Sequence, residues 1–292
     1  MLACPGNDPS LLIRCKEFGF DMRKSILALF LFAALRGWAQ SGLDDQWIAF
    51  DRAGSPNSDL QCFRSSNVSE RGGNLVLQTH RETASCESID LKRATYEYTS
   101  SSVAMRSFRF LYGTVEFRAK FGGGNHSGSW PAVWMLDASC QASDPTGTDD
   151  RCNGQEIDIA EIMDGNFSQI NEQIHVDGYS RHDGCEAPVW DASRNYHTYK
   201  LIWSPGSLVF KIDGSTTCKI EKPYVPNSPM YLKASVYVGK YGGRVNDQSL
   251  PWVTTIDYVK ITRGKEVLFE DDFNGAVPAG GSPSSGAKAP HF

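Results

Sequence analysis

The feature that most limits the fold of this chain is its division into short runs of alternating apolar and polar residues. From Trp47 onward these runs are separated by turn-forming pairs such as Gly72-Gly73 and Asp213-Gly214. No long segment repeats its apolar residues with the 3.6-residue period of an amphipathic helix. This pattern predicts an all-β antiparallel sandwich or barrel. The predicted strands are 74–79, 114–121, 130–136, 156–161, 173–176, 198–203, 208–212, 231–238 and 255–262.

The predicted strand 156–161 reads Glu-Ile-Asp-Ile-Ala-Glu. Glu156 and Asp158 are two positions apart, so they share one face of the strand, while the two isoleucines point into the core. Regular alternation would place Glu161 on the buried face, where an unpaired carboxylate is costly. A β-bulge at Ile159 or Ala160 adds one residue and returns Glu161 to the acidic side. The sequence therefore predicts three carboxyls on one face.

Two glutamates on one face are the chemical requirement for hydrolysing a glycoside with retention, which needs two carboxyls about 5–5.5 Å apart. Asp158 adds a negative charge that helps one glutamate keep its proton near neutral pH. The alternative is an acidic strand that merely faces solvent. Neighbouring strands favour the enzyme, because Trp130 and Trp134 share a face of one of them and His175 lies on the other. Flat aromatic rings can serve as platforms for sugars, and core packing is their other explanation.

Glu-Ile-Asp-Ile-Ala-Glu, preceded by Trp130-Pro-Ala-Val-Trp134 and followed by the strand of His175, resembles glycoside hydrolase family 16, in its bulged, laminarinase-like branch. Residues 57–61, 112–120, 196–203 and 256–261 agree, so the resemblance covers about residues 47–261. It implies a two-sheet antiparallel β-jelly-roll sandwich with a substrate cleft across the concave sheet. It also implies a retaining endo-β-glucanase that hydrolyses β-1,3 or mixed β-1,3/1,4 glucan, requires no cofactor for catalysis and works as a monomer on polysaccharide.

The resemblance also implies roles for single residues. Glu156 matches the family's nucleophile, Glu161 its acid/base and Asp158 the aspartate that tunes them. His175 matches a histidine beside the site, with a hydrogen-bonded core histidine as the alternative. Asn57 resembles a polar residue that reaches the non-reducing side of the cleft.

Departures from the family pattern leave the substrate open. Ser235 stands where the family usually has an asparagine. Asp257 matches a residue that often binds a structural calcium ion, but an ordinary surface aspartate is an equal alternative, because calcium needs about 6–8 oxygen ligands.

The alternative functions are a galactan hydrolase of the agarase or carrageenase kind and a transglycosylase. A non-catalytic glucan-binding protein is least favoured, because both glutamates are present.

The N-terminal part reads as an export signal. Met22-Arg-Lys leads into an apolar run at 25–35 and then Gly37-Trp-Ala39, which are the basic, apolar and cleavage regions of a signal peptide. The run is about half the ~20 residues that a membrane-spanning helix needs. We expect translation to start at Met22, residues 1–39 to be an upstream stretch plus signal peptide, 40–274 to be the catalytic domain and 275–292 to be a disordered tail. The expected location is extracellular or periplasmic.

The cysteine content agrees with export, and the charge limits the possible partners. Six cysteines lie beyond residue 39, and an even number in a secreted chain predicts disulfides, although six allow 15 pairings. Our working hypothesis pairs neighbours in sequence, which joins Cys140 to Cys152. Residues 1–39 hold five of the 29 basic and three of the 34 acidic residues, which leaves 24 and 31 and a net charge of −7. An acidic chain without a long basic run is not expected to bind nucleic acid, an anionic membrane or a heavily sulfated substrate.

Overall fold

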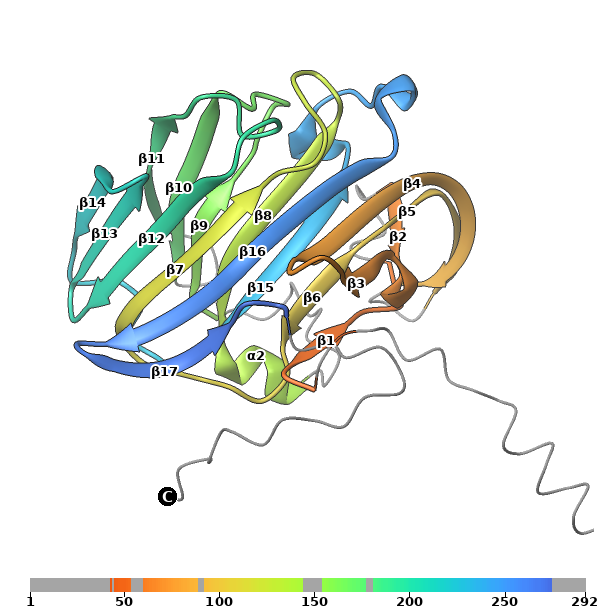
Figure 1. Ribbon diagram of the computed structural model, residues 1–292. Coiled ribbons are helices and arrows are strands. Elements are labelled where there is room, and N and C mark those ends of the chain that lie inside the picture. The colour runs from red at the N-terminus through yellow and green to blue at the C-terminus, as the bar shows by residue number, and fades with distance from the viewer. Residues whose placement is uncertain are drawn as a thin grey trace, which may run out of the picture. The chain divides into compact units, whose positions relative to one another are not determined.

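The computed structural model describes residues 43, 45–53, 60–88, 92–143, 154–176 and 181–274. The strands in these residues form two sheets that lie one over the other (Figure 1). The antiparallel two-sheet jelly roll predicted from the sequence is confirmed, and within these residues the pairing of β2 with β5 is the one parallel pairing between named strands.

The first sheet has seven strands. In spatial order they are β1 (Trp47–Ala49), β6 (Ser102–Met105), β15 (Met230–Val238), β8 (Ser129–Asp137), β9 (Glu156–Glu161), β10 (Gln169–Val176) and β11 (Arg181–Pro188). The predicted acidic strand is β9, and it has two strands of the sheet on its one side and four on the other. Its backbone is therefore paired along both edges.

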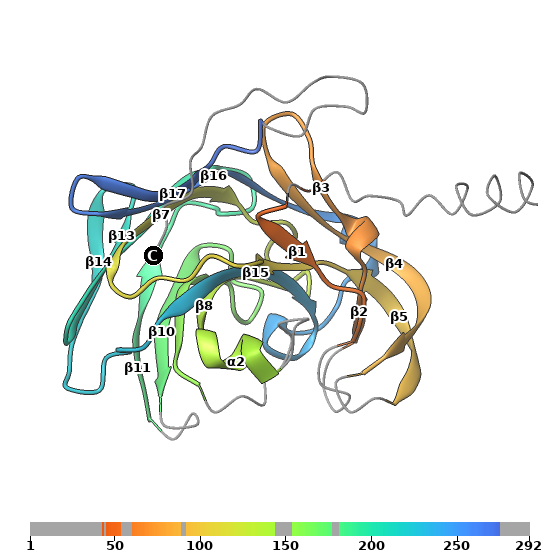
Figure 2. The same ribbon diagram turned by 90° about the horizontal axis from the view of Figure 1, so that it is seen from below.

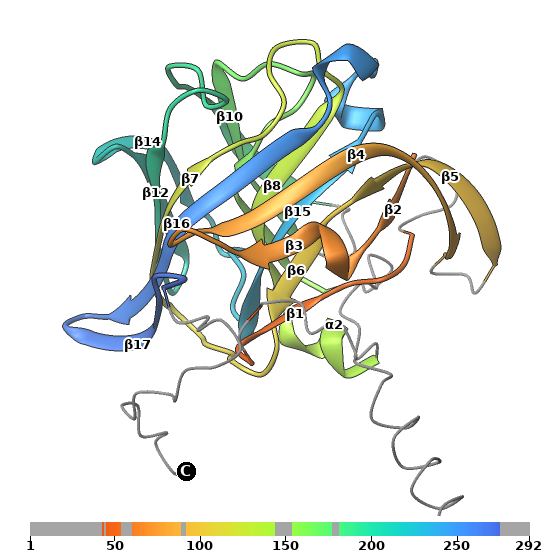
Figure 3. The same ribbon diagram turned by 45° about the vertical axis from the view of Figure 1, so that its right-hand side comes forward.

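The second sheet has ten strands. Its main path is β14 (Ser215–Glu221), β13 (Ser207–Ile212), β12 (His197–Ser204), β7 (Gly113–Lys120), β16 (Trp252–Arg263), β4 (Leu75–Glu87), β5 (Arg93–Ser100) and β2 (Gln61–Phe63). Two further strands pair at its side, β17 (Glu266–Asp271) with β16 and β3 (Val68–Glu70) with β4. Figure 3 shows β7, β16 and β4 running side by side across this sheet.

Helical structure is short in the described residues. It comprises α2 (Ala138–Ser143) and the 3₁₀ turns η2 (Ser65–Asn67), η3 (Lys240–Gly242) and η4 (Asp247–Ser249). Within that part of the chain, none of the helices has the length and apolar character needed to cross a bilayer.

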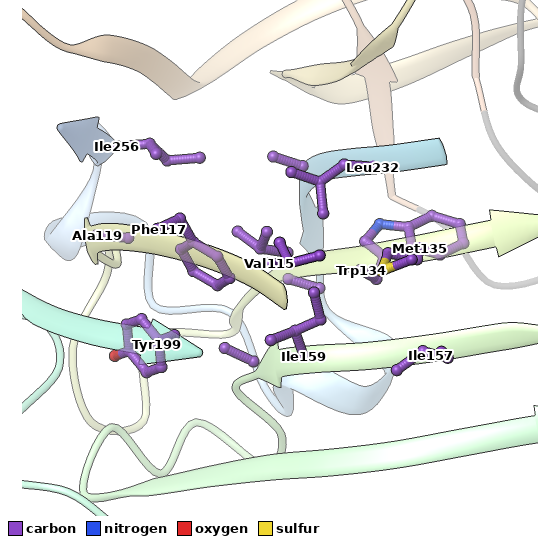
Figure 4. Packing of buried hydrophobic residues seen from close by; sticks show 14 of the residues in the cluster. Val115, Phe117, Ala119, Trp134, Met135, Ile157, Ile159, Tyr199, Leu232 and Ile256 are labelled. Atoms are coloured by element: carbon purple, nitrogen blue, oxygen red, sulfur yellow. The ribbon is translucent and has the colours of Figure 1, made fainter. Parts of the chain in front are cut away.

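The core fills the space between the sheets because each sheet turns its apolar alternation inward. Ile157 and Ile159 of β9 are buried there, as the strand pattern predicts. Figure 4 shows Ile159 close to Val115 of β7, whereas Ile157 lies further along β9, near its ladder partner Met135 of β8. One side of β9 is thus fixed by apolar packing, and the other side carries the acids.

Two disulfides agree with the pairing of neighbours in sequence. Cys62–Cys86 joins β2 to β4 within the second sheet. Cys185–Cys218 joins β11 to β14, which are outer strands of different sheets and lie next to each other in Figure 2. Cys140 is also disulfide-bonded, while its predicted partner Cys152 lies outside the described residues. The predicted signal peptide, tail and Asn57 lie outside them as well.

Candidate active site

The predicted β-bulge is present in β9. On the neighbouring strand β8, Trp134 faces Asp158 and Val133 faces Ala160, so Ile159 has no partner of its own. The ladder to β10 shifts over the same stretch. The extra residue restores the parity of Glu161, which faces Ala132 on β8. All three acids therefore lie on one surface, called the acidic face below.

Paired residues on four adjacent strands form rows across the acidic face. Each row contains one acid of β9, so the acids are spaced along the strand and each has neighbours on both sides. From β8 to β11 the rows are Leu136–Glu156–His175–His182, Trp134–Asp158–Gln173–Gly184 and Ala132–Glu161–Asn171–Glu186.

The three carboxyls are buried, and burial sets their electrostatics. Burial raises the pKa of Asp158 well above its ordinary value, and the negative charge of Glu161 raises it further. Burial also raises the pKa of Glu161, against the opposing effects of a hydrogen bond from Trp130 and the nearby imidazole of His175. Both groups consequently hold a proton at higher pH than an exposed carboxyl would.

His175 connects two of the acids. Its Nε2 atom lies 3.2 Å from Asp158 Oδ2 and 4.0 Å from Glu156 Oε1. One ligand atom of each of these three residues lies within 4.8 Å of the others, which is a spacing that could hold a metal ion. Two atoms of this group, His175 Nε2 and Asp158 Oδ2, already contact each other. His175 thus lies beside the site, where the sequence placed it.

Asp257, the calcium candidate, is engaged in an ion pair. Its Oδ2 atom lies 2.8 Å from Arg118 Nη1, so an arginine already neutralises its charge. In the described part of the chain, Asp257 is not part of any group of three or more metal-ligating side chains. An aspartate in a surface ion pair accounts for what is seen there.

Trp130 contacts the predicted acid/base directly. Its Nε1 atom donates a hydrogen bond of 2.6 Å to Glu161 Oε1. Its ring centroid lies 4.7 Å from that of Tyr237 and 5.0 Å from that of Tyr241. The sequence predicted an aromatic platform here, but it did not indicate the hydrogen bond or the two tyrosines. Their signal was weak, because both lie near the glycine-rich end of β15.

Trp134 is more enclosed, with 6% of its surface exposed. Lys233 Nζ lies 4.1 Å from the ring centroid, and Trp134 Nε1 donates a 3.1 Å hydrogen bond to Ser235 Oγ. Ser235, the residue in place of the usual asparagine, thus anchors the indole. Lys233 was not identified from the sequence. The available signal was a lysine within an apolar strand, two positions from Ser235 and therefore on the same face. Of the two tryptophans, Trp130 is the one whose indole N–H donates a hydrogen bond to a carboxyl.

A β-jelly roll with buried glutamates on one strand face, beside tryptophan and histidine, has the parts of a glycoside hydrolase. Residues 59–260 match the model of the glycosyl hydrolases family 16, and the chain belongs to that family.

Similar proteins carry several specificities. A keratan-sulfate endo-1,4-β-galactosidase of Sphingobacterium multivorum is 28% identical over 253 residues, which are 82% of this chain and 56% of that protein. A β-glucanase of Rhodothermus marinus is 26% identical over 72% of this chain and 76% of its own length. The chain thus spans little more than half of the first of these relatives. The LamA catalytic structure of Zobellia galactanivorans aligns with a TM-score of 0.63, 26% identity and coverage of 76% of this chain and 92% of that one. A related structure of a LamA variant holds laminaritriose and laminaritetraose.

Proposed function

We propose that this protein is a retaining endo-β-glucanase that cleaves β-1,3 or mixed β-1,3/1,4 glucan at the acidic face. The observation that carries the proposal is the arrangement of β9, where the bulge at Ile159 brings Glu156 and Glu161 onto one face. The glucan-cleaving relatives and the laminari-oligosaccharide complex support this substrate class.

In the first step, Glu161 gives its proton to the glycosidic oxygen while Glu156 attacks the anomeric carbon. The bond to the leaving sugar breaks, and a covalent glycosyl-enzyme forms on Glu156. The raised pKa of Glu161 suits this step, because the residue must arrive protonated. The hydrogen bond from Trp130 fixes the direction of its carboxyl group.

In the second step, the same Glu161, now ionised, removes a proton from water. That water attacks the anomeric carbon, releases Glu156 and regenerates the original anomer. Both steps use side-chain carboxyls, so they require no cofactor. Asp158 and His175 lie between the two glutamates, where burial and the negative charge of Glu161 raise the pKa of Asp158.

We further propose that the enzyme works outside the cytoplasm. Cys62–Cys86 and Cys185–Cys218 support this, because disulfides persist in oxidising compartments. The predicted signal peptide is the sequence counterpart of the same proposal.

Two variants test the assignment of roles. Glu161→Ala should still form the glycosyl-enzyme from an activated aryl glycoside, and azide should restore turnover and yield the β-glycosyl azide. Glu156→Ala should lose hydrolysis but still build β-linked product from an α-glycosyl fluoride. Glu266→Ala, an exposed carboxylate on β17, is the control and should keep wild-type activity. Rescue of Glu156→Ala alone, with α-azide as product, would reverse the two roles.

A substrate panel tests the specificity. Soluble products are measured from laminarin, lichenan, agarose, carrageenan and keratan sulfate. Products from laminarin or lichenan alone support the proposal. The similarity to the keratan-sulfate endo-β-galactosidase makes galactan hydrolysis the second candidate, and products from the galactans alone would replace the first.

A further inference from the structure

Trp190 is unusual among the large apolar side chains in the described part of the chain, because 82% of its surface is exposed. The other exposed large apolar residues there have exposures of 37–49%. They are Leu60, Ile202, Tyr241 and Val267. A side chain of this size stabilises a fold by burial, so Trp190 contributes little of that stabilisation.

Strand β11 ends at Pro188, and its alternation, extended by two residues, puts Trp190 on the acidic side of the sheet. Ala187 is buried and Val189 packs against the core. Glu186 and Pro188, which alternate with them along the chain, are exposed. The Val189 amide donates a 3.0 Å hydrogen bond to Ser168 O, so the ladder to β10 extends past the last strand residue. Trp190 therefore follows Glu186 and Pro188 on the exposed face, and Glu186 belongs to the row of Glu161.

The backbone that carries the indole is held firmly. Trp190 O accepts hydrogen bonds from Asn195 Nδ2 at 3.1 Å and lies 2.9 Å from His197 Nε2. His197 Nδ1 in turn lies 2.6 Å from Asp213 Oδ2. The Phe121 amide donates a hydrogen bond to Ala192 O, and the Ala192 amide donates one to Phe167 O. These contacts fix the position of the turn without covering the ring.

An exposed aromatic ring carried by a fixed turn, at the end of the acidic face, is suited to stacking against a pyranose. We propose that Trp190 is an outer platform for the glucan chain, binding a neutral β-linked glucose unit where the polymer passes β11. The inference rests on the proposed function, since it names a further contact with the same substrate. The platform binds sugar remote from the reacting bond, so it affects substrates long enough to reach it.

Kinetics with substrates of two lengths test the platform. Trp190→Ala should raise KM for long laminarin about three- to tenfold, the worth of one aromatic stacking contact. The same variant should leave kcat/KM for a short aryl glycoside unchanged. Trp190→Phe should recover most of the affinity, because it keeps a flat ring. Val267→Ala, an exposed apolar residue on β17, is the matched control and should change neither substrate. An unchanged ratio of long to short kcat/KM in Trp190→Ala would overturn the inference.

Binding without turnover separates this inference from the proposed function. In a Glu156→Gln background, laminarin in a native gel should retard the protein, and adding Trp190→Ala should weaken the retardation. If the wild type cleaves no glucan, the proposed function fails, while the gel still reports on the platform. Equal retardation with and without Trp190 refutes the platform alone. A dimer in sedimentation that Trp190→Ala dissociates would also refute it, because the ring would then bind a second copy.

Discussion

Glu172 of β10 provides a test of how burial controls the stability of this fold. The residue is 1% exposed and lies between the sheets, opposite Cys185 in the ladder. Its Oε1 atom accepts a 2.7 Å hydrogen bond from Thr217 Oγ1 on β14. Its Oε2 atom has no hydrogen-bond partner in the described part of the chain, and neither has the nearby hydroxyl of Tyr199. Burial raises the pKa of Glu172 from 4.5 to about 7, although the Thr217 hydrogen bond opposes the rise.

This shift sets the pH range in which stability changes. Below about pH 4.5 the carboxyl is neutral in the folded and the unfolded chain, so its ionisation costs nothing. Between pH 4.5 and 7 only the unfolded chain loses the proton, and the free energy of unfolding falls as the pH rises. Above the folded pKa the loss is complete. At about 1.4 kcal/mol per pH unit, the full difference is about 3 kcal/mol.

Glu172→Gln keeps the shape of the side chain and the acceptor for Thr217 but removes the ionisation. The variant should match the wild type near pH 4.5 and be about 2–3 kcal/mol more stable at pH 8. Urea unfolding followed by tryptophan fluorescence at several pH values measures this difference. Glu266→Gln, on the exposed start of β17, is the control and should show no such pH dependence. The reasoning is refuted if the advantage of Glu172→Gln does not grow with pH, or if Glu266→Gln shows the same growth.

Two further changes probe the site and the sandwich. Trp130→Phe removes the hydrogen bond that lowers the pKa of Glu161. The alkaline limb of the pH–kcat profile should therefore move to higher pH. A limb that stays in place or moves to lower pH would contradict the assignment of Glu161 as the acid. Replacing both Cys185 and Cys218 by alanine opens a loop of 33 residues and should lower the free energy of unfolding by about 4 kcal/mol. Urea unfolding measures this loss. A loss below about 1 kcal/mol would show that the link between the sheets is not needed.

Both ends of β9 and its bulge were predicted from the sequence, because the alternation of the strand is strong and because Glu161 falls at a position that regular alternation would bury. A conflict between parity and burial has few solutions, and the bulge is one of them. Strand β11 was not predicted, since Arg-His-Asp-Gly-Cys-Glu-Ala-Pro contains a glycine, a proline and little apolar alternation. Such a composition is tolerated at a sheet edge, where one side of the backbone needs no partner. The edge position is a tertiary fact that the local sequence does not contain.

Side-chain partners within the site were also beyond prediction. The sequence indicated that Trp130 and Trp134 share a face, but their different surroundings come from β15, about 100 residues away in the chain. Lys233 and Ser235 enclose Trp134, whereas Trp130 extends to Glu161. Contacts of this kind depend on the order of strands in the sheet.

The bulge at Ile159 makes the acid pair tolerant of a deletion at this point of the gene. Loss of Ile159 alone would leave Glu-Ile-Asp-Ala-Glu, in which regular alternation keeps all three acids on one face. The pairings of Ala160 with Val133 and of Glu161 with Ala132 could then follow Asp158–Trp134 without a break. Two strand lengths, differing by one residue, are thus compatible with the same set of acids. An insertion next to Ile159 would not keep this arrangement, because it would turn either the acids or the isoleucines to the opposite face of the strand.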